Sequence, residues 1–118
     1  MAQPKVEDVE RIKKKVRKMA AAKVLAGDSA DARLSLGHLD GCQVYIRAGF
    51  GPQARAPCPL AQDRLIWVLD GSLEIEDLAG RVTYVSQGES TVLRSGAAYR
   101  FTFPQLCLYL SIDAEAQR

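Results

Sequence analysis

The side chains that most often carry chemistry are few in this chain of 118 residues. His38 is the only histidine, and the turn-forming Asp40-Gly41 beside it indicates a solvated hairpin turn. Its imidazole titrates near neutrality and could act as a general base, but one histidine cannot build a His-rich metal site. The cysteines are odd in number and widely spaced: Cys42, Cys58 and Cys107. We therefore expect no disulfide framework and no structural zinc, and we interpret Cys42 and Cys107 as small core residues.

Catalysis would have to use isolated side chains. Cys58 lies between two prolines and has no histidine at a fixed distance to activate its thiol. Tyr99 and Asp63 are the other candidates for proton transfer, which needs groups of tuned pKa within reach of one substrate. These residues form no tight constellation, so the catalytic residues are unknown.

Aromatic residues alternate in the last quarter of the chain. Tyr99, Phe101 and Phe103 fall on one face of a strand, where they form either an aromatic wall or the filling of a barrel. The more polar face of the following strand carries three smaller or polar side chains: Cys107, Tyr109 and Ser111.

The composition is that of one globular domain, with 47% apolar and 25% charged residues. The net charge of +2 is too small to argue for nucleic acid, and no apolar run approaches the roughly 20 residues that span a bilayer. No secretion signal precedes the chain, so we expect a cytoplasmic protein with reduced thiols. The charge is uneven, because all lysines lie before residue 24 and form a basic head on a mildly acidic body.

The basic head has the pattern of an amphipathic helix of about 18 residues. Its apolar stripe recurs at steps of three and four: Val6, Val9, Ile12, Val16, Met19, Ala20 and Val24. Gly27 is a suitable stop, so we divide the chain into a helical extension over residues 1–27 and a barrel domain over residues 28–118. The helix packs on the barrel or a second subunit, binds an acidic partner or nucleic acid, or lies on a membrane surface.

From Asp31 onward the apolar period changes to two, and a turn signal follows every eight to twelve residues. Asp70-Gly71 predicts a hairpin, residues 77–80 predict a second turn, and Pro104 is expected to separate the last strand, Leu106 to Ile112. This pattern predicts an all-β antiparallel sandwich or barrel behind the helix.

The segment from Gly49 to Phe103 resembles the cupin family in the spacing of its motifs. Both family motifs are framed by glycines, and the matching positions here are Gly51, Gly71, Gly88 and Gly96. Residues 66–75 also resemble the family's central hairpin. The resemblance implies a cupin-type antiparallel β-barrel, or jelly roll.

The positions that hold a metal in cupins depart from the family pattern. Pro57 and Pro59 occupy the first two histidine positions, Arg64 the glutamate position (Asp63 if the spacing is one shorter), and Tyr99 the last histidine position. Proline has no side-chain donor and arginine is a permanent cation. The resemblance therefore implies a barrel that holds no metal or other cofactor.

If the barrel closes as in its relatives, Arg64 and Tyr99 point to where a metal would lie. A guanidinium there suits a small organic anion, and the candidate ligand-binding residues are Arg64, Tyr99, Phe101, Cys107 and Tyr109. This predicts a sensor or carrier of a small organic molecule. A salt bridge from Arg64 to Asp63 or Asp70 is the structural alternative.

Two other functions stay open. One is a lyase- or isomerase-type enzyme that uses Tyr99, Cys58 or Asp63, and the other is an interaction module that acts through the basic helix. We also expect a homodimer, because Leu65 to Leu69 and the Leu106, Leu108 and Leu110 face offer apolar surface. Trp67, opposite in parity to Arg64, suits either strand packing or that contact. Nucleic acid and membrane partners are not expected.

Overall fold

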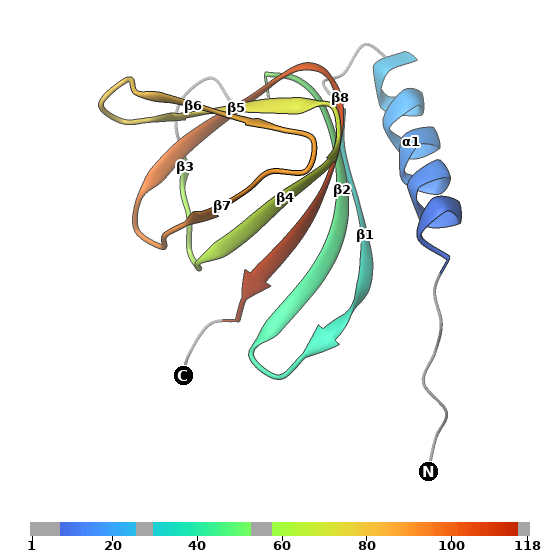
Figure 1. Cartoon of the computed structure of the whole chain (residues 1–118), viewed down its shortest axis with the longest axis horizontal. Coiled ribbons are helices and arrows are strands. Elements are labelled where there is room, and N and C mark those ends of the chain that lie inside the picture. Colours follow the sequence, from blue (N-terminus) through green and yellow to red (C-terminus); the bar gives the residue numbers. More distant parts are fainter. Residues whose placement is uncertain (1–7, 26–29, 53–57, 116–118) are drawn as a thin grey trace.

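The computed structural model describes residues 8–25, 30–52 and 58–115. One helix precedes an antiparallel sheet of eight strands in this part of the chain, which confirms the all-β architecture with an N-terminal helix (Figure 1). The elements are α1 (Val9–Leu25), β1 (Ala30–Leu39), β2 (Cys42–Pro52), β3 (Cys58–Pro59), β4 (Arg64–Asp70), β5 (Ser72–Asp77), β6 (Val82–Ser86), β7 (Ser90–Leu93) and β8 (Ala98–Ala114).

The longest strand, β8, is the centre of the sheet. It pairs with β2, β3, β4 and β5, and the strand order along the main path is β1-β2-β8-β4-β7. The strands curve around one interior, while β1 and β7 remain the ends of that path (Figure 1). The result is a barrel-like jelly roll whose sheet does not close.

Pro104 does not divide β8, so the prediction of two separate strands is wrong. Phe103 pairs with Gly51 and Cys107 pairs with Gly49, whereas residues 104–106 have no partner in the described register. A proline inside this irregularity removes no ladder hydrogen bond, because its nitrogen faces no partner strand. The strand therefore continues to Ala114.

The predicted hairpin at Asp70-Gly71 is also wrong. β4 pairs with β7 and β8, while β5 pairs with β6 and again with β8. Gly71 has a φ of 83°, and a Cβ there would lie 2.7 Å from the carbonyl oxygen of Leu106. Glycine therefore allows a tight bend that carries the chain along β8 from one part of the barrel to the next.

The turn over residues 77–80 forms as predicted and closes the β5–β6 hairpin. The backbone N–H groups of Ala79 and Arg81 donate to Oδ1 of Asp77, and these bonds, with that from Arg81 first, lower the pKa of Asp77. The motif glycines Gly51, Gly71, Gly88 and Gly96 all have positive φ, between 76° and 84°. Their spacing was therefore a sound guide to the turns.

Helix α1 begins at an N-cap, because Oδ1 of Asp8 accepts hydrogen bonds from the backbone N–H groups of Glu10 and Arg11. Of the predicted stripe, Ile12, Val16 and Ala20 are buried, whereas Val9 and Met19 are exposed. Val6 and Gly27 lie outside the described residues, as does the side chain of Val24. Within the described ranges, no helix has the length and apolar character needed to cross a bilayer.

The structure has two apolar cores, one on each face of the sheet. The barrel interior contains Ile66, Val68, Leu73, Ile75, Val85, Leu93, Phe103, Cys107 and Tyr109. The outer core lies under α1 and contains Ile12, Val16, Ala20, Ala32, Ile46, Ala48 and Leu108. Since Leu108 is covered by the chain's own helix, it cannot contribute to the predicted dimer surface.

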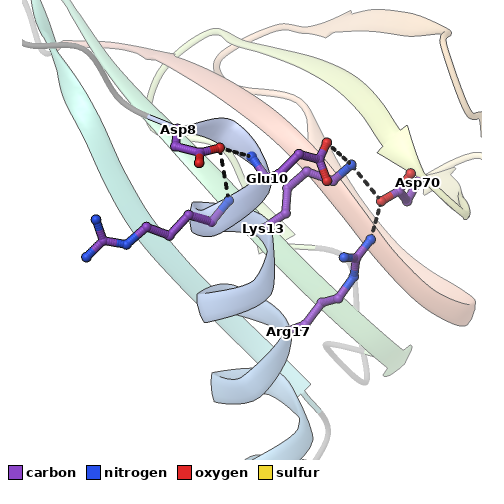
Figure 2. A network of polar contacts seen from close by, with 6 residues as sticks. Asp8, Glu10, Lys13, Arg17 and Asp70 are labelled. Carbon is purple, nitrogen blue, oxygen red and sulfur yellow. Dashed lines mark hydrogen bonds and ion pairs between the residues drawn. The ribbon is translucent and has the colours of Figure 1, made fainter.

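A charged contact fixes the helix beside the barrel. Asp70 at the end of β4 accepts from Arg17, and its Oδ2 lies 3.1 Å from Nζ of Lys13 (Figure 2). Glu10 lies 3.5 Å from the same Lys13 nitrogen but is well exposed. The basic head is therefore attached to the bend between β4 and β5 as well as to the outer core.

Replacing the shared carboxylate should loosen the helix. We expect Asp70→Asn to lower the free energy of unfolding by about 1 kcal/mol, because both cations lose their partner while Asp70 and Arg17 are partly exposed. The hydrogen bond to Asp70 raises the pKa of Lys13, so the Lys13 part of this contribution is complete at neutral pH and is lost as the pH rises from the ordinary pKa of lysine through the raised one, while the Arg17 part remains. Urea denaturation measures the change. Glu10→Gln is the matched control and should stay within about 0.5 kcal/mol, and an Asp70→Asn protein as stable as the native one would contradict the assignment.

The thiol of Cys107 should be inert in the folded protein. Its side chain is fully buried, and this burial, with a smaller effect of the Asp70 charge, raises the pKa of Cys107 to about 12. At pH 8 very little thiolate exists and the reagent has no access. We expect iodoacetamide to modify Cys107 only after denaturation and to modify the half-buried Cys42 sooner, as followed by mass spectrometry of peptides. Equal modification rates in the native state would contradict the burial of Cys107.

Candidate anion-binding site

Strand β2 turns its polar face toward the barrel interior. Ile46 and Ala48 are buried under α1 on the outer face, so the alternate residues Tyr45, Arg47 and Gly49 point to the inner face. There Arg47 stands opposite Tyr109, and Tyr45 stands opposite Ser111. A strand that is exposed to water on neither face thus brings an arginine into the interior.

Two arginines converge on one carboxylate at the end of β8. Asp113 lies opposite Arg64 in the β4–β8 ladder, and its Oδ2 accepts from Arg47 at 2.9 Å. Nε of Arg64 lies 3.0 Å from Oδ1 of the same carboxylate, an ion pair without the angle of a hydrogen bond. The hydroxyl of Ser111 also donates to Oδ1. Asp113 therefore serves two cations and a hydroxyl at once.

The arginine pair is desolvated but not satisfied. The side chain of Arg47 is 9% exposed and that of Arg64 is 21% exposed. Nε of each is buried and has no hydrogen-bond partner among the described residues. A buried guanidinium N–H without an acceptor costs free energy, so Nε of Arg47 is the donor here that lacks an acceptor among the described residues, whereas Nε of Arg64 already lies 3.0 Å from Oδ1 of Asp113.

A third arginine, on β1, faces the Arg47–Arg64 pair. Arg33 stands directly opposite Arg47, and both guanidinium carbons lie close to the ring centre of Tyr45, at 4.8 and 5.1 Å. The ring attracts both cations, but like charges at opposite positions of a ladder repel. No described carboxylate lies within ion-pair distance of Arg33. Three guanidinium groups against one carboxylate leave an excess of positive charge.

The predicted structural partners of Arg64 are wrong, because neither Asp63 nor Asp70 contacts it. Oδ1 of Asp63 accepts from the backbone N–H of Ser95 at 2.7 Å, and its Oδ2 lies 3.5 Å from Arg94. The bond from Ser95 is the main reason that the pKa of Asp63 is lowered. Asp70 instead holds the helix. Asp113 could not be identified from the sequence as the partner of Arg64. It lies near the C-terminal end of the chain and comes opposite Arg64 only through the pairing of β4 with β8.

The other predicted ligand-binding residues lie deeper along the inner face. Cys107 and Tyr109 are buried in the interior core, and the ring of Tyr109 stacks on Phe103 with centroids 5.8 Å apart. Phe101 and Tyr99 pack against the same core and are partly buried. The predicted residues therefore share the inner face of the barrel, but some of their side chains fill its interior core.

Tyr99 also lines a small cavity of about 170 Å³ at the end of the barrel formed by β5, β6 and β7. Its other lining residues are Ile75, Asp77, Arg81, Thr83, Thr91, Val92 and Leu93. Leu93, one of these lining residues, stands opposite Arg64 in the β4–β7 ladder. Within the described ranges, no hydrogen bond or ion pair joins Arg64 to Tyr99.

Gly49 shows how tightly the middle of the interior is filled. It stands opposite Cys107, and a Cβ at this position would lie 2.4 Å from the ring of Phe103. Any side chain would displace that ring. The arginines therefore lie on one side of a packed aromatic layer.

The candidates for catalysis are dispersed. His38 lies at the end of β1 rather than within the turn, is 54% exposed, and contacts Glu115, which also accepts from Gln43 at 3.2 Å. The backbone of Cys58 pairs with that of Tyr99, but its side chain lies outside the described residues, as does Pro57. Asp63 is occupied at the turn that holds Ser95.

The side chains at the positions that hold a metal in cupins do not fit a metal ion. Pro59 has no donor atom, Arg64 is a cation, and Tyr99 offers a single phenol oxygen. The described part of the chain contains no group of three or more His, Cys, Asp or Glu side chains that could hold a metal. The arginine pair is therefore the most unusual polar feature of the interior.

No protein-family model matches this sequence, and no curated protein matches it either. Solved structures do match in their fold. The EutQ protein of Clostridium difficile superposes with a TM-score of 0.65 at 19% identity, over 76% of this chain and 71% of that one. A cupin-2 domain containing protein from Shewanella frigidimarina gives 0.64 at 16% identity, over 71% and 80%.

A cupin superfamily protein from Desulfitobacterium hafniense is similar to the same degree, with a TM-score of 0.62 at 12% identity over 73% of this chain and 78% of that one. At these identities the likeness concerns the arrangement of strands and not the chemistry of a site. Together with the observed sheet and the positions of the motif glycines, it shows that this chain has the fold of the cupin superfamily.

Proposed function

We propose that this protein is a metal-free cupin-fold sensor or carrier that binds a small organic anion in its barrel. The carboxylate or similar group of the ligand is held by the guanidinium groups of Arg47 and Arg64. The observation that carries the proposal is the convergence of two arginines on a single carboxylate, with the buried Nε of Arg47 left without an acceptor among the described residues.

The chemistry of arginine supports an anion as the occupant. A guanidinium presents donors in a planar fork, and an oxyanion in a desolvated corner accepts charge-assisted hydrogen bonds from it. Asp113 already neutralises one of the two charges, so an incoming anion would balance the other. Nothing in this chemistry requires a metal.

The apolar part of the ligand would face the aromatic layer. In this proposal Tyr109 is its nearest wall, since it stands opposite Arg47. Phe101 and Cys107 support that wall from the core, while Tyr99 belongs to the adjoining cavity. The site thus keeps the predicted residues and adds Arg47 and Asp113.

An enzyme of the lyase or isomerase type has less support. Proton transfer needs an acid or base within reach of the bound substrate. Asp63 is ionised and accepts from the backbone N–H of Ser95 at a turn, and among the described residues no hydrogen bond or ion pair joins Tyr99 to the arginine pair. The helix as an interaction module rests only on its exposed lysines, among them Lys14, Lys15 and Lys18.

Titration with small anions tests the proposal. In 15N-labelled protein at pH 7, butyrate or benzoate should shift the Nε–Hε signals of Arg47 and Arg64, because those groups gain an acceptor. Binding should also raise the melting temperature by about 5 °C once the anion is at ten times its dissociation constant. Equal ionic strength in sodium chloride separates binding from screening.

Variants locate the effect. Arg64→Lys keeps the charge but loses the fork, and should weaken binding about tenfold, whereas Lys18→Gln on the exposed helix removes one charge and should change nothing. If Arg64→Lys binds as tightly as the native protein, or if no arginine signal responds at tens of millimolar anion, the barrel does not act as proposed.

The expected homodimer also stays a proposal, and the outer face of β4 and β7 is its best contact. Trp67 is 47% exposed there, Leu65 stands opposite Val92, and α1 covers neither. Burying a large aromatic side chain is a strong source of association energy. Light scattering should give the mass of two chains, and Trp67→Glu should give the mass of one. Tyr84→Glu, an exposed aromatic on β6, is the control, and a monomeric native protein would contradict the dimer.

A further inference from the structure

The arginine site has two parts at different depths. The buried part is Arg47 and Arg64 around Asp113, and the outer part is Arg33, whose residue is exposed on the strand at the end of the sheet path. Tyr45 connects the two parts, because both Arg33 and Arg47 lie against its ring.

We infer that the ligand is a dianion with two separated acid groups, such as a short dicarboxylate, one bound by Arg47 and Arg64 and the other by Arg33. This inference rests on the proposed function and deepens it. The charge of the site is its first support, since three guanidinium groups face one carboxylate and leave two positive charges. A monoanion would neutralise only one of them.

The second support is the ladder position of Arg33. Arg33 and Arg47 stand directly opposite each other on neighbouring strands, where like charges destabilise the pair. The two described carboxylates at the end of the chain are already engaged, Asp113 by Arg47 and Arg64, and Glu115 by His38 and Gln43. An anion bound between Arg33 and the Arg47–Arg64 pair would be attracted by the guanidinium groups on both sides and would offset their mutual repulsion.

The third support distinguishes a dicarboxylate from a phosphate. A phosphate carries both charges on one group, whereas a dicarboxylate carries them on two groups that can contact different arginines. Arg33 on β1 is the cross-strand neighbour of Arg47 on β2, whereas Arg64 comes from β4, with β2 and β8 between β1 and β4. Two groups joined by a short carbon chain match this separation, and the ring of Tyr45 offers apolar contact to the chain between them.

Calorimetry with a matched pair of probes tests the inference. Succinate and butyrate each have four carbons but carry two charges and one charge at pH 7. At constant ionic strength we expect succinate to bind the native protein about tenfold more tightly than butyrate. In Arg33→Gln, succinate should lose that advantage while the affinity for butyrate stays unchanged. Lys18→Gln should keep both affinities.

The outcomes separate the inference from the proposed function. Equal affinities for succinate and butyrate in the native protein overturn the dianion and leave the anion site standing. Binding of neither probe overturns both. Inorganic phosphate that binds as tightly as succinate and is insensitive to Arg33→Gln would overturn the two separated groups. If Arg33→Gln unfolds, Arg33→Met, a long side chain without the charge, serves instead, with an expected loss confined to succinate.

Discussion

Strand β8 is the constraint on which the rest of the structure depends. It is the common partner of β2, β3, β4 and β5, so its residues decide what faces the interior along the whole barrel. The unpaired residues 104–106 leave Phe103 and Cys107 on the same face, since an even number of positions separates them. One face of one strand therefore supplies the aromatic layer and, at its end, the carboxylate Asp113.

The sequence predicted the parts of the fold that local rules decide. The stripe of α1, the inward face of Cys107 and Tyr109, and the glycines with positive φ all follow from periodicity or backbone sterics. The hairpin prediction at Asp70-Gly71 is wrong because this dipeptide is only a local turn signal. Which strands pair is decided by contacts between residues far apart in the sequence. The prediction that Pro104 separates two strands is wrong for the same reason. Proline destabilises a strand only where a neighbouring strand would otherwise accept a hydrogen bond from the backbone N–H that proline lacks.

The site was predictable only in part. Arg64 was found through the resemblance to cupins, but Arg33, Arg47 and Asp113 were not. An alternating strand usually turns its polar residues to water, and β2 alternates Tyr45 and Arg47 with Ile46 and Ala48. A signal was nevertheless present, because an amphipathic helix must cover an apolar sheet face. If α1 covers Ile46 and Ala48, then Arg47 has to face the interior.

The arrangement around Asp113 is hard to explain as a purely structural ion pair. Desolvating a charged group is costly, and a buried pair is favourable only when its remaining donors are also satisfied. Here a second arginine shares the same carboxylate, Nε of Arg47 lacks an acceptor among the described residues, and a third arginine adds repulsion from the opposite strand. Apolar side chains of similar size would give a more stable barrel. Unfavourable electrostatics of this kind are common where a site is shaped for a bound group, and an anion bound here would offset the excess positive charge, which is the reasoning behind our proposal.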